Sequence, residues 1–337
     1  MGIYILGIES SCDDTSAAIL HEKRILSNII ANQELHSHFG GVVPELASRA
    51  HQQNIIPVIE YALQKANINK NKLSAVAFTR GPGLLGSLLV GVSFAKSFAY
   101  ALNIPLIEVD HMQAHILVHF IEDDINQKIP KFPFLCLTVS GGHTQIVKVN
   151  APLKMEVLGQ TIDDASGEAF DKAAKILGLP YPGGPAIDQA AKMGNNKFSF
   201  SKPKIPNLDF SFSGLKTSFL YTIRDQLKTN PNFIKENLND LASSIQKAII
   251  DILLEKLILA SQITGIKEIA LAGGVSANSK LRKIFSQVAA DKGWNLYLPK
   301  LQYTTDNAAM VAITGYFKYL DKDFTDISIA PYTKTTI

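Results

Sequence analysis

The feature that most constrains the fold is a weak internal repeat. "YILGIESSCDDTSAAIL" begins at Tyr4 and "FLCLTVSGGHTQIVKV" begins at Phe134, and each runs from an apolar strand through a short polar turn into a second strand. Each stretch opens one half of the chain, so we predict two homologous halves whose polar turns face each other across a cleft. Backbone N–H groups in such turns can hold the phosphates of a nucleotide, and two ordinary hairpins without a ligand are the alternative.

Strand-like and helical stretches alternate along most of the chain, which predicts an α/β architecture with helices covering a largely parallel sheet. The predicted strands are residues 3–9, 16–20, 75–79, 106–109, 134–140, 145–149, 267–272 and 295–298. The predicted helices are residues 44–65, 84–102, 111–120, 167–177, 238–263, 278–292 and 307–320. A length of 337 residues favours two domains, which we place at 1–132 and 133–337, with an insertion at about 195–231.

Composition limits the class of protein. The net charge of +3 is too small and too evenly scattered to argue for nucleic-acid binding by itself. Cys12 and Cys136 lie in apolar, strand-like surroundings, which is typical of reduced core cysteines. The N-terminus lacks the basic segment of a signal peptide, and polar residues interrupt the long apolar run from Gly83, which favours a buried helix over a membrane span. We therefore expect a cytoplasmic protein with no membrane association.

His111 and His115 lie four residues apart on a predicted helix, so their Cβ atoms are about 5–6 Å apart and both imidazoles can reach one ion. Such pairs also occur by chance. Zincin peptidases share this spacing but need a Glu directly after the first His, where this chain has Met112, so a peptidase is not predicted. Asp306 is the candidate third ligand, although an Asp directly before a helix also suits an N-cap. Two His and one carboxylate suit iron(II), with zinc(II) as the alternative.

Glycine turns supply the candidate nucleotide site. In "IALAGGVSANSKLRKIF" a strand leads through Gly273–Gly274 to a helix start at Asn278, which would let a nucleotide approach the positive end of the helix. The stretch "RGPGLLGSLLVG" is not a P-loop, because Ser87 stands where Lys is required. Asp171 and Asp188 could accept hydrogen bonds from ligand hydroxyls, or they could be ordinary solvated helix carboxylates.

Several motifs together resemble one known family. They are "GIESSCDDTSAAI", "GGVVPELASRAH", "TRGPGLLGSLLVG", "HMQAH", "VSGGHTQ", "SGEAFDKAAKILGLPYPGGP", "DFSFSGLKT", "AGGVSAN" and "TTDNAAM". In order and spacing, from residue 2 to about 332, the chain resembles the tRNA adenosine threonylcarbamoyltransferases (the TsaD family), formerly described as glycoprotein endopeptidases. The resemblance implies a duplicated, actin-like, ATPase-type fold. It also implies transfer of a threonylcarbamoyl group from threonylcarbamoyl-AMP to the amine of the adenosine next to the anticodon, in tRNAs that read codons starting with A.

The resemblance also implies the site residues. The metal ligands of the family fall on His111, His115 and Asp306, and the metal is usually iron and sometimes zinc. The substrate contacts of the family fall on Thr138, Val139, Ser140, Gly141, Gly142, Asp171, Gly184, Asp188 and Asn278. Departures from the family pattern are few: Ser10, Asp14, Asp110 and Gln113 replace residues common in other members, and Gln113 removes an acid but no ligand.

The implied chemistry assigns a role to each part of the site. A bound metal would polarise the carbamoyl carbonyl as a Lewis acid. The glycine turns would hold the adenine nucleotide, as threonylcarbamoyl-AMP or ATP. A carboxylate should help to remove the proton of the weakly nucleophilic aromatic amine, and Asp13 in the first hairpin is our candidate.

The implied partners are tRNA, a degenerate paralogue and a small P-loop ATPase of the bacterial modification complex. Lys197, Lys202, Lys204 and Lys216 in the insertion are the densest basic candidates for tRNA phosphates, and a solvated loop is the alternative. Two other functions on the same fold are a sugar-kinase-like ATPase, which needs no His pair, and a non-catalytic scaffold, which should lack the ligands. The presence of all three ligands favours the transferase.

Overall fold

The five strands of the first half form one sheet in a computed structural model that describes residues 2–33, 36, 39–124 and 127–334. These strands are β1 (Tyr4–Glu9), β2 (Thr15–His21), β3 (Arg24–Ala31), β4 (Ala75–Gly81) and β5 (Leu106–Asp110). Their order in the sheet is β3-β2-β1-β4-β5. The first three strands pair antiparallel as a meander, whereas β4 runs parallel to β1 and β5 runs parallel to β4.

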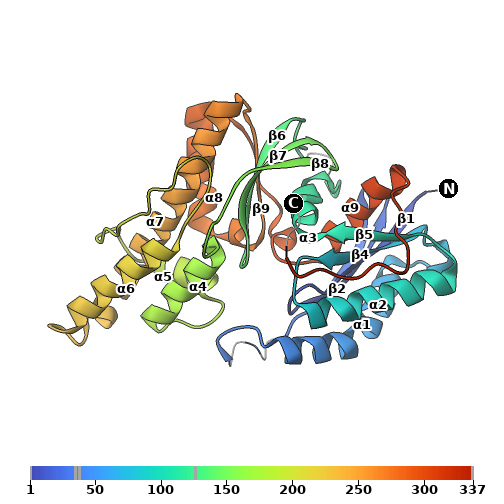
Figure 1. Cartoon of the computed structure of the whole chain (residues 1–337), viewed down its shortest axis with the longest axis horizontal. Coiled ribbons are helices and arrows are strands. Elements are labelled where there is room, and N and C mark those ends of the chain that lie inside the picture. The colour runs from blue at the N-terminus through green and yellow to red at the C-terminus, as the bar shows by residue number, and fades with distance from the viewer. Residues whose placement is uncertain (1, 34–35, 37–38, 125–126, 335–337) are drawn as a thin grey trace. The chain divides into compact units, whose positions relative to one another are not determined.

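The second half repeats this topology. Its strands are β6 (Phe134–Val139), β7 (Thr144–Ala151), β8 (Lys154–Gln160), β9 (Glu268–Ala272) and β10 (Asn295–Tyr297). They lie in the order β10-β9-β6-β7-β8, so each strand takes the place of its counterpart in the first sheet. Figure 1 labels β6, β7, β8 and β9 of this second sheet. The predicted duplication is confirmed. Both sheets are mixed rather than largely parallel, because the hairpin that opens each half adds an antiparallel strand.

The chain divides into two units. Unit 1 is formed by the described parts of Met1–Pro130, Pro152–Lys154 and Pro299–Ile337, and unit 2 by Lys131–Ala151 and Met155–Leu298. Residues 299–334, which were predicted to belong to the second lobe, therefore lie in unit 1. Their helix packs on β1, β2 and β4, which explains why the end of the chain returns to the first sheet.

Four helices cover the sheet of unit 1: α1 (Pro44–Ala66), α2 (Leu85–Leu102), α3 (His111–Leu117) and α9 (Ala308–Leu320). Leu6 and Ile8 pack in a core with α1 and α2, whereas Gly7 points to the opposite face and contacts α9. By length and composition alone α2 could cross a membrane. One face of α2, with Leu88 and Val92, is buried against the sheet and α1, whereas Leu85, Leu89 and Tyr100 on its other face are exposed.

Unit 2 carries α4 (Ser166–Leu177), α5 (Gly183–Ala191), α6 (Ser213–Leu227), α7 (Phe233–Thr264) and α8 (Ser279–Lys292). Short 3-10 turns are η2 (Lys70–Lys72), η3 (Val118–Phe120), η4 (Gly274–Ala277) and η5 (Leu301–Tyr303). The predicted insertion at 195–231 contains α6, and its Phe210, Phe212 and Phe219 are fully buried. These aromatic rings therefore belong to the core of unit 2.

Close packing between β1 and α9 gives a test of the fold. A Cβ atom on Gly7 would lie 2.4 Å from Ala308 O and 2.8 Å from Ala312 N, so Gly7→Ala must push α9 away from the sheet. We expect a loss of about 1–3 kcal/mol in the free energy of unfolding, measured by chemical denaturation. The control is Gly214→Ala in α6, where the nearest atom would lie 3.7 Å away and stability should hold or rise. Equal midpoints for Gly7→Ala and the wild type would contradict this packing.

Candidate functional site

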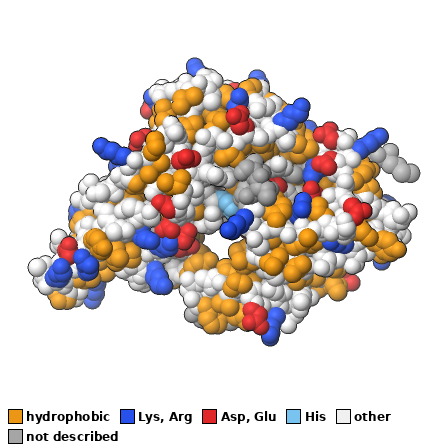
Figure 2. All heavy atoms as spheres, in the orientation of Figure 1, with side chains coloured by type: hydrophobic (Ala, Val, Ile, Leu, Met, Phe, Trp, Pro, Cys, Tyr) orange, Lys and Arg blue, Asp and Glu red, His pale blue; other side chains and the backbone are white. Residues whose placement is uncertain are grey.

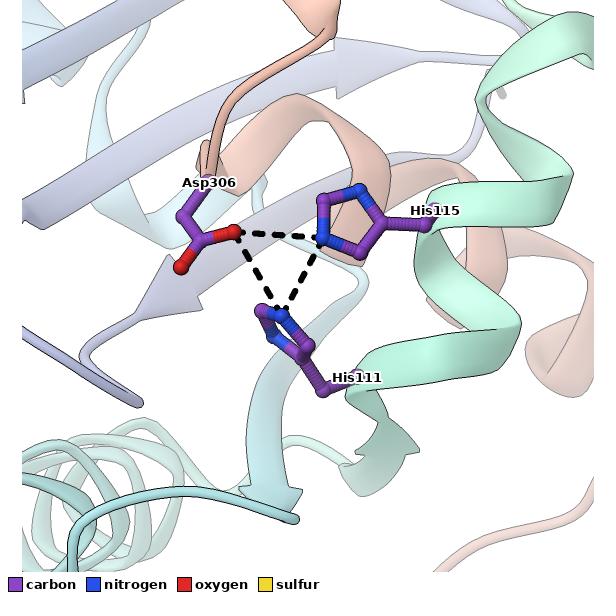
Figure 3. A group of neighbouring side chains, drawn as sticks. All are labelled: His111, His115 and Asp306. Atoms are coloured by element: carbon purple, nitrogen blue, oxygen red, sulfur yellow. Dashed lines mark hydrogen bonds and ion pairs between the residues drawn. The ribbon is translucent and has the colours of Figure 1, made fainter. Parts of the chain in front are cut away.

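The two predicted histidine ligands lie on α3, one turn apart. This short helix begins at His111 because Asp110 caps it: Asp110 Oδ1 accepts hydrogen bonds from Met112 N and Gln113 N, both at 2.9 Å. The i,i+4 spacing then directs both rings to one side, with the Nε2 atoms of His111 and His115 3.1 Å apart (Figure 3).

Asp306 completes the cluster from the loop between η5 and α9 (Figure 3). The cap of α9 is Asn307, whose side chain accepts a hydrogen bond from Met310 N at 3.2 Å. The carboxylate of Asp306 is therefore not needed as a cap, and it faces the two rings. Its Oδ1 lies 3.4 Å from His111 Nε2 and 3.1 Å from His115 Nε2.

These three atoms fit a metal site. Separations of 3.1–3.4 Å are those of neighbouring ligands that each lie about 2.0–2.1 Å from one ion. The histidine side chains are buried, and the Nδ1 atom of His115 has no hydrogen-bond partner among the described residues. Burial alone would raise the pKa of Asp306, but the facing His111 ring holds that pKa well below its ordinary value. Without a metal, and against the effect of burial, the Asp306 and Glu9 carboxylates in turn raise the pKa of His111, and a bound cation would replace its Nε2 proton. One ionised carboxylate with two neutral imidazoles is then the donor set that iron(II) and zinc(II) share.

Glu9, which the sequence analysis did not select, orients His111 from behind. It is fully buried at the end of β1 and accepts hydrogen bonds from Ser11 N at 2.5 Å and Thr79 Oγ1 at 2.6 Å. Its Oε2 lies 3.2 Å from His111 Nδ1. A carboxylate at Nδ1 keeps the ring proton there and leaves Nε2 free to bind a metal. The signal in the sequence was an acidic residue at the end of an otherwise apolar strand.

The turn that contains Asp13 and Asp14 joins β1 to β2 in the same unit. His51 on α1 holds this turn: its Nε2 donates to Cys12 O at 3.0 Å, and its Nδ1 accepts from Thr15 Oγ1 at 2.7 Å. Burial lowers the pKa of His51, which keeps the ring neutral as these two bonds require. Burial also raises the pKa of the Cys12 thiol, so this cysteine is not a ready nucleophile.

The glycine turns of unit 2 lie side by side because β6 and β9 are adjacent parallel strands, paired from Leu135 to Thr138. Thr138 and Val139 end β6, and Ser140, Gly141 and Gly142 form the turn that follows. Gly273, at φ 86°, approaches this turn so closely that a Cβ atom would lie 2.4 Å from Val139 O. Gly141, Gly142 and Gly274 face open space, since an added Cβ would meet no atom within 4 Å.

The remaining predicted substrate residues already have structural partners. Asp171 on α4 accepts from Gly183 N at 2.7 Å and also from the backbone of Gly184, at the start of α5. Asp188 on α5 accepts from Gln246 and twice from Ser279. Asn278 caps α8 by accepting from Leu281 N at 2.9 Å. The structure thus joins Asp188 to the start of α8 and Asp171 to the start of α5.

The lysines predicted to meet tRNA are mostly paired with acids. The ion pairs are Lys197–Asp240 at 2.6 Å, Lys202–Asp251 at 2.7 Å and Lys216–Asp164 at 3.4 Å. On the face drawn in Figure 2, acidic and basic side chains are interspersed in the same way. Paired lysines offer a weaker positive field to a phosphate backbone than the sequence alone indicated.

The repeated sheet topology defines a duplicated actin-like fold. Among solved structures, HypF from T. kodakarensis has this fold, with a TM-score of 0.64 and 15% identity, covering 95% of this chain and 48% of HypF. The chain thus spans about half the length of that protein.

Comparison of the sequence with known proteins identifies the family. The family described as tRNA N6-adenosine threonylcarbamoyltransferase (TsaD) matches residues 24–313. Two relatives with this name, from Phocaeicola vulgatus and Christiangramia forsetii, are each 62% identical; the first match covers 100% of both chains, and the second 98% of both. This chain belongs to the tRNA N6-adenosine threonylcarbamoyltransferase family, a family of acyltransferases.

Asp14 gives a test of the electrostatics in the first turn. Burial, with the neighbouring Asp13 carboxylate adding to it, raises the pKa of Asp14 from 3.8 to about 7. A raised carboxyl pKa stabilises the fold fully below the unfolded value of 3.8, and this contribution is lost as the pH rises through about 7. In metal-free protein, Asp14→Asn should therefore flatten the fall of the unfolding free energy across this pH range, by up to about 1.4 kcal/mol per pH unit.

The matched control for this titration is Asp240→Asn. The Lys197 ammonium holds the pKa of Asp240 below its ordinary value, so Asp240 gives stability that is lost only as the pH falls through the acid range. Asp240→Asn should leave the slope above pH 4 unchanged. Identical slopes for Asp14→Asn and the wild type would contradict the raised pKa.

Proposed function

We propose that this chain transfers the threonylcarbamoyl group from threonylcarbamoyl-AMP to the exocyclic amine of the adenosine next to the anticodon, in tRNAs that read codons starting with A. The observation that carries the proposal is the cluster of His111, His115 and Asp306 in a chain of this family. A sugar-kinase-like ATPase would need the glycine turns of unit 2 but not this cluster, and a non-catalytic scaffold would need neither. The cluster therefore favours the transferase over both.

His111 Nε2, His115 Nε2 and Asp306 Oδ1 would hold one divalent ion, iron(II) or zinc(II). When bound, the ion supplies Lewis acidity that polarises a carbonyl of the acyl group. Glu9 keeps the proton of His111 on Nδ1 and fixes the plane of its ring. The buried positions of the two histidines limit the access of water, which protects an activated acyl group from hydrolysis.

The adenylate part of the donor is assigned to unit 2. The open glycine turns at 138–142 and 273–274 would bring backbone N–H groups to its phosphate, and ATP would use the same turns. Asp171 and Asp188 would accept hydrogen bonds from its hydroxyls, and Gly184 and Asn278 would contact it from the starts of α5 and α8. AMP then leaves as the amine attacks the carbamoyl carbon.

The acceptor amine needs a base, because an aromatic amine is a poor nucleophile. Asp13 is our candidate from the sequence, and it lies in the turn held by His51. Asp14 is a second candidate, because a pKa of about 7 suits proton transfer near neutral pH. If Asp13→Asn lowers the rate of acyl transfer to tRNA and Asp14→Asn does not, then Asp13 is the base.

The proposed reaction also implies the partners of this chain. We assign tRNA as the acceptor, a degenerate paralogue and a small P-loop ATPase as partner proteins, and the cytoplasm as the location, with no membrane association. Within the part of the insertion that contains Lys197, Lys202 and Lys204, only Lys204 has no ion pair among the described residues. To contact tRNA phosphates, Lys197 and Lys202 would have to break their ion pairs with Asp240 and Asp251.

His115→Ala tests the metal and the reaction together. We expect the purified variant to lose most of its bound iron or zinc in elemental analysis, because two ligands hold an ion much more weakly than three. Mass spectrometry of tRNA nucleosides should show loss of threonylcarbamoyladenosine in cells that carry only this variant. His21→Ala, a half-buried histidine in the same unit that stacks on Tyr4, is the control and should retain both. Equal metal content in His115→Ala and the wild type would refute the metal centre.

Gly274→Val tests the nucleotide turns. The added side chain meets no protein atom within 4 Å of its Cβ, so the protein should fold while bulk fills the space in front of the turn. We expect the Kd for AMP, measured by calorimetry, to rise by at least about tenfold, equivalent to a loss of about 1.4 kcal/mol. Gly214→Val in α6 is the control, and its Kd for AMP should equal that of the wild type. An unchanged Kd for AMP in Gly274→Val would show that the nucleotide does not bind at this turn.

A further inference from the structure

The segment after α9 crosses unit 1 and is anchored mainly by its backbone. We call residues 321–334 the C-terminal strap. Thr325 N donates to Leu106 O at 2.8 Å, and the Arg80 guanidinium donates to Ala330 O at 2.9 Å. The Lys96 ammonium donates to Ile329 O. The strap is therefore tied to both β4 and β5, the strands that end beside α3.

Tyr332 makes the contact that reaches the metal-binding helix. Its hydroxyl donates to Asp110 Oδ2 at 2.5 Å, and its backbone N donates to Arg80 O at 3.2 Å. The Arg80 guanidinium lies over its ring, 5.2 Å from the centroid. The strap comes so close to Gly81 that a Cβ atom there would lie 2.2 Å from Tyr332 O. Ring, hydroxyl and backbone of Tyr332 are thus all held.

Asp110 links this tyrosine to the ligands. One oxygen of its carboxylate receives the two backbone N–H groups of the first turn of α3, and the other receives the Tyr332 hydroxyl. The helix has only seven residues, and a helix this short owes its position to its cap and its packing rather than to its own stability. His111 is the first residue of the helix, so a shift of the cap moves this ligand directly.

We propose that Tyr332 is a positioning residue for the metal centre: its hydroxyl holds Asp110, Asp110 starts α3, and α3 sets the separation of the His111 and His115 Nε2 atoms. The inference rests on the proposed metal centre. It makes the end of the chain part of the site, although no strap atom is among the three ligand atoms. Without the Tyr332 hydroxyl, the Asp110 carboxylate is free to rotate. The separation of the His111 and His115 Nε2 atoms is then no longer fixed, although all three ligand atoms remain.

Tyr332→Phe removes the hydroxyl and keeps the ring under Arg80. After removal of metal with a chelator, the Kd for Zn²⁺ would be measured by competition with a chromophoric chelator. We expect a rise of about tenfold, the lower end of the range for residues that support a metal ligand. Tyr297→Phe is the matched control, because its hydroxyl also lies 2.5 Å from a carboxylate, Glu268, but in unit 2. Its Kd for Zn²⁺ should equal that of the wild type.

Asp110→Ser is the second variant. Serine can still cap α3 but is too short to reach Tyr332, so it should weaken Zn²⁺ binding by the same factor. The double variant with Tyr332→Phe should be no weaker than either single one, because both break one link. A lower melting temperature with an unchanged Kd for Zn²⁺ in both single variants would overturn the inference and leave the metal centre standing. A wild type that binds no Zn²⁺ through His115 would overturn both.

Discussion

The site in unit 1 depends on holding two carboxylates and two imidazoles together, where Glu9 and both histidines are buried and Asp306 is half-buried. An unpaired carboxylate in such a place costs several kcal/mol, so each must be met by a donor or a cation. Glu9 is met by Ser11, Thr79 and His111. Among the described residues, the Asp306 carboxylate faces the Nε2 atoms of His111 and His115, and these two atoms also face each other. A divalent cation on that side would satisfy all three atoms at once, at the place where the end of β1 meets α3 and the loop before α9.

The duplication explains how one fold provides two different kinds of site. In each half a hairpin opens the sheet, and its turn lies at the end of the central strand, β1 or β6. In unit 1 this turn carries Asp13 and Asp14 beside the ligand cluster, whereas in unit 2 it carries Gly141 and Gly142, which leave the backbone open. Under the proposed function, the same position in the topology would serve acid–base chemistry beside the metal centre in one half and anion contacts in the other.

Much of this arrangement could be predicted from the sequence, and the failures have physical causes. All eight predicted strands exist, but the edge strands β3 and β8 were missed, because half-exposed strands show no continuous apolar run. The i,i+4 spacing of the histidines was predictable because it is local. The residue pattern around Asp306 left a ligand and an N-cap both open, and the family resemblance implied a ligand. The structure gives the cap to Asn307. Glu9 was missed because its partner, His111, lies 102 residues away.

Asp171 and Asp188 of unit 2, which the proposed function assigns to the ligand, already hold the starts of α5 and α8. A carboxylate can accept about four hydrogen bonds, and Asp188 already accepts three, from Gln246 and Ser279. Asp171 accepts two from the start of α5, so each retains capacity for a ligand hydroxyl. Such a group is held in place before the ligand arrives, which lowers the entropy cost of binding. The consequence is that replacing either Asp must disturb its helices as well as its ligand, whereas the open glycines can be altered without touching the fold.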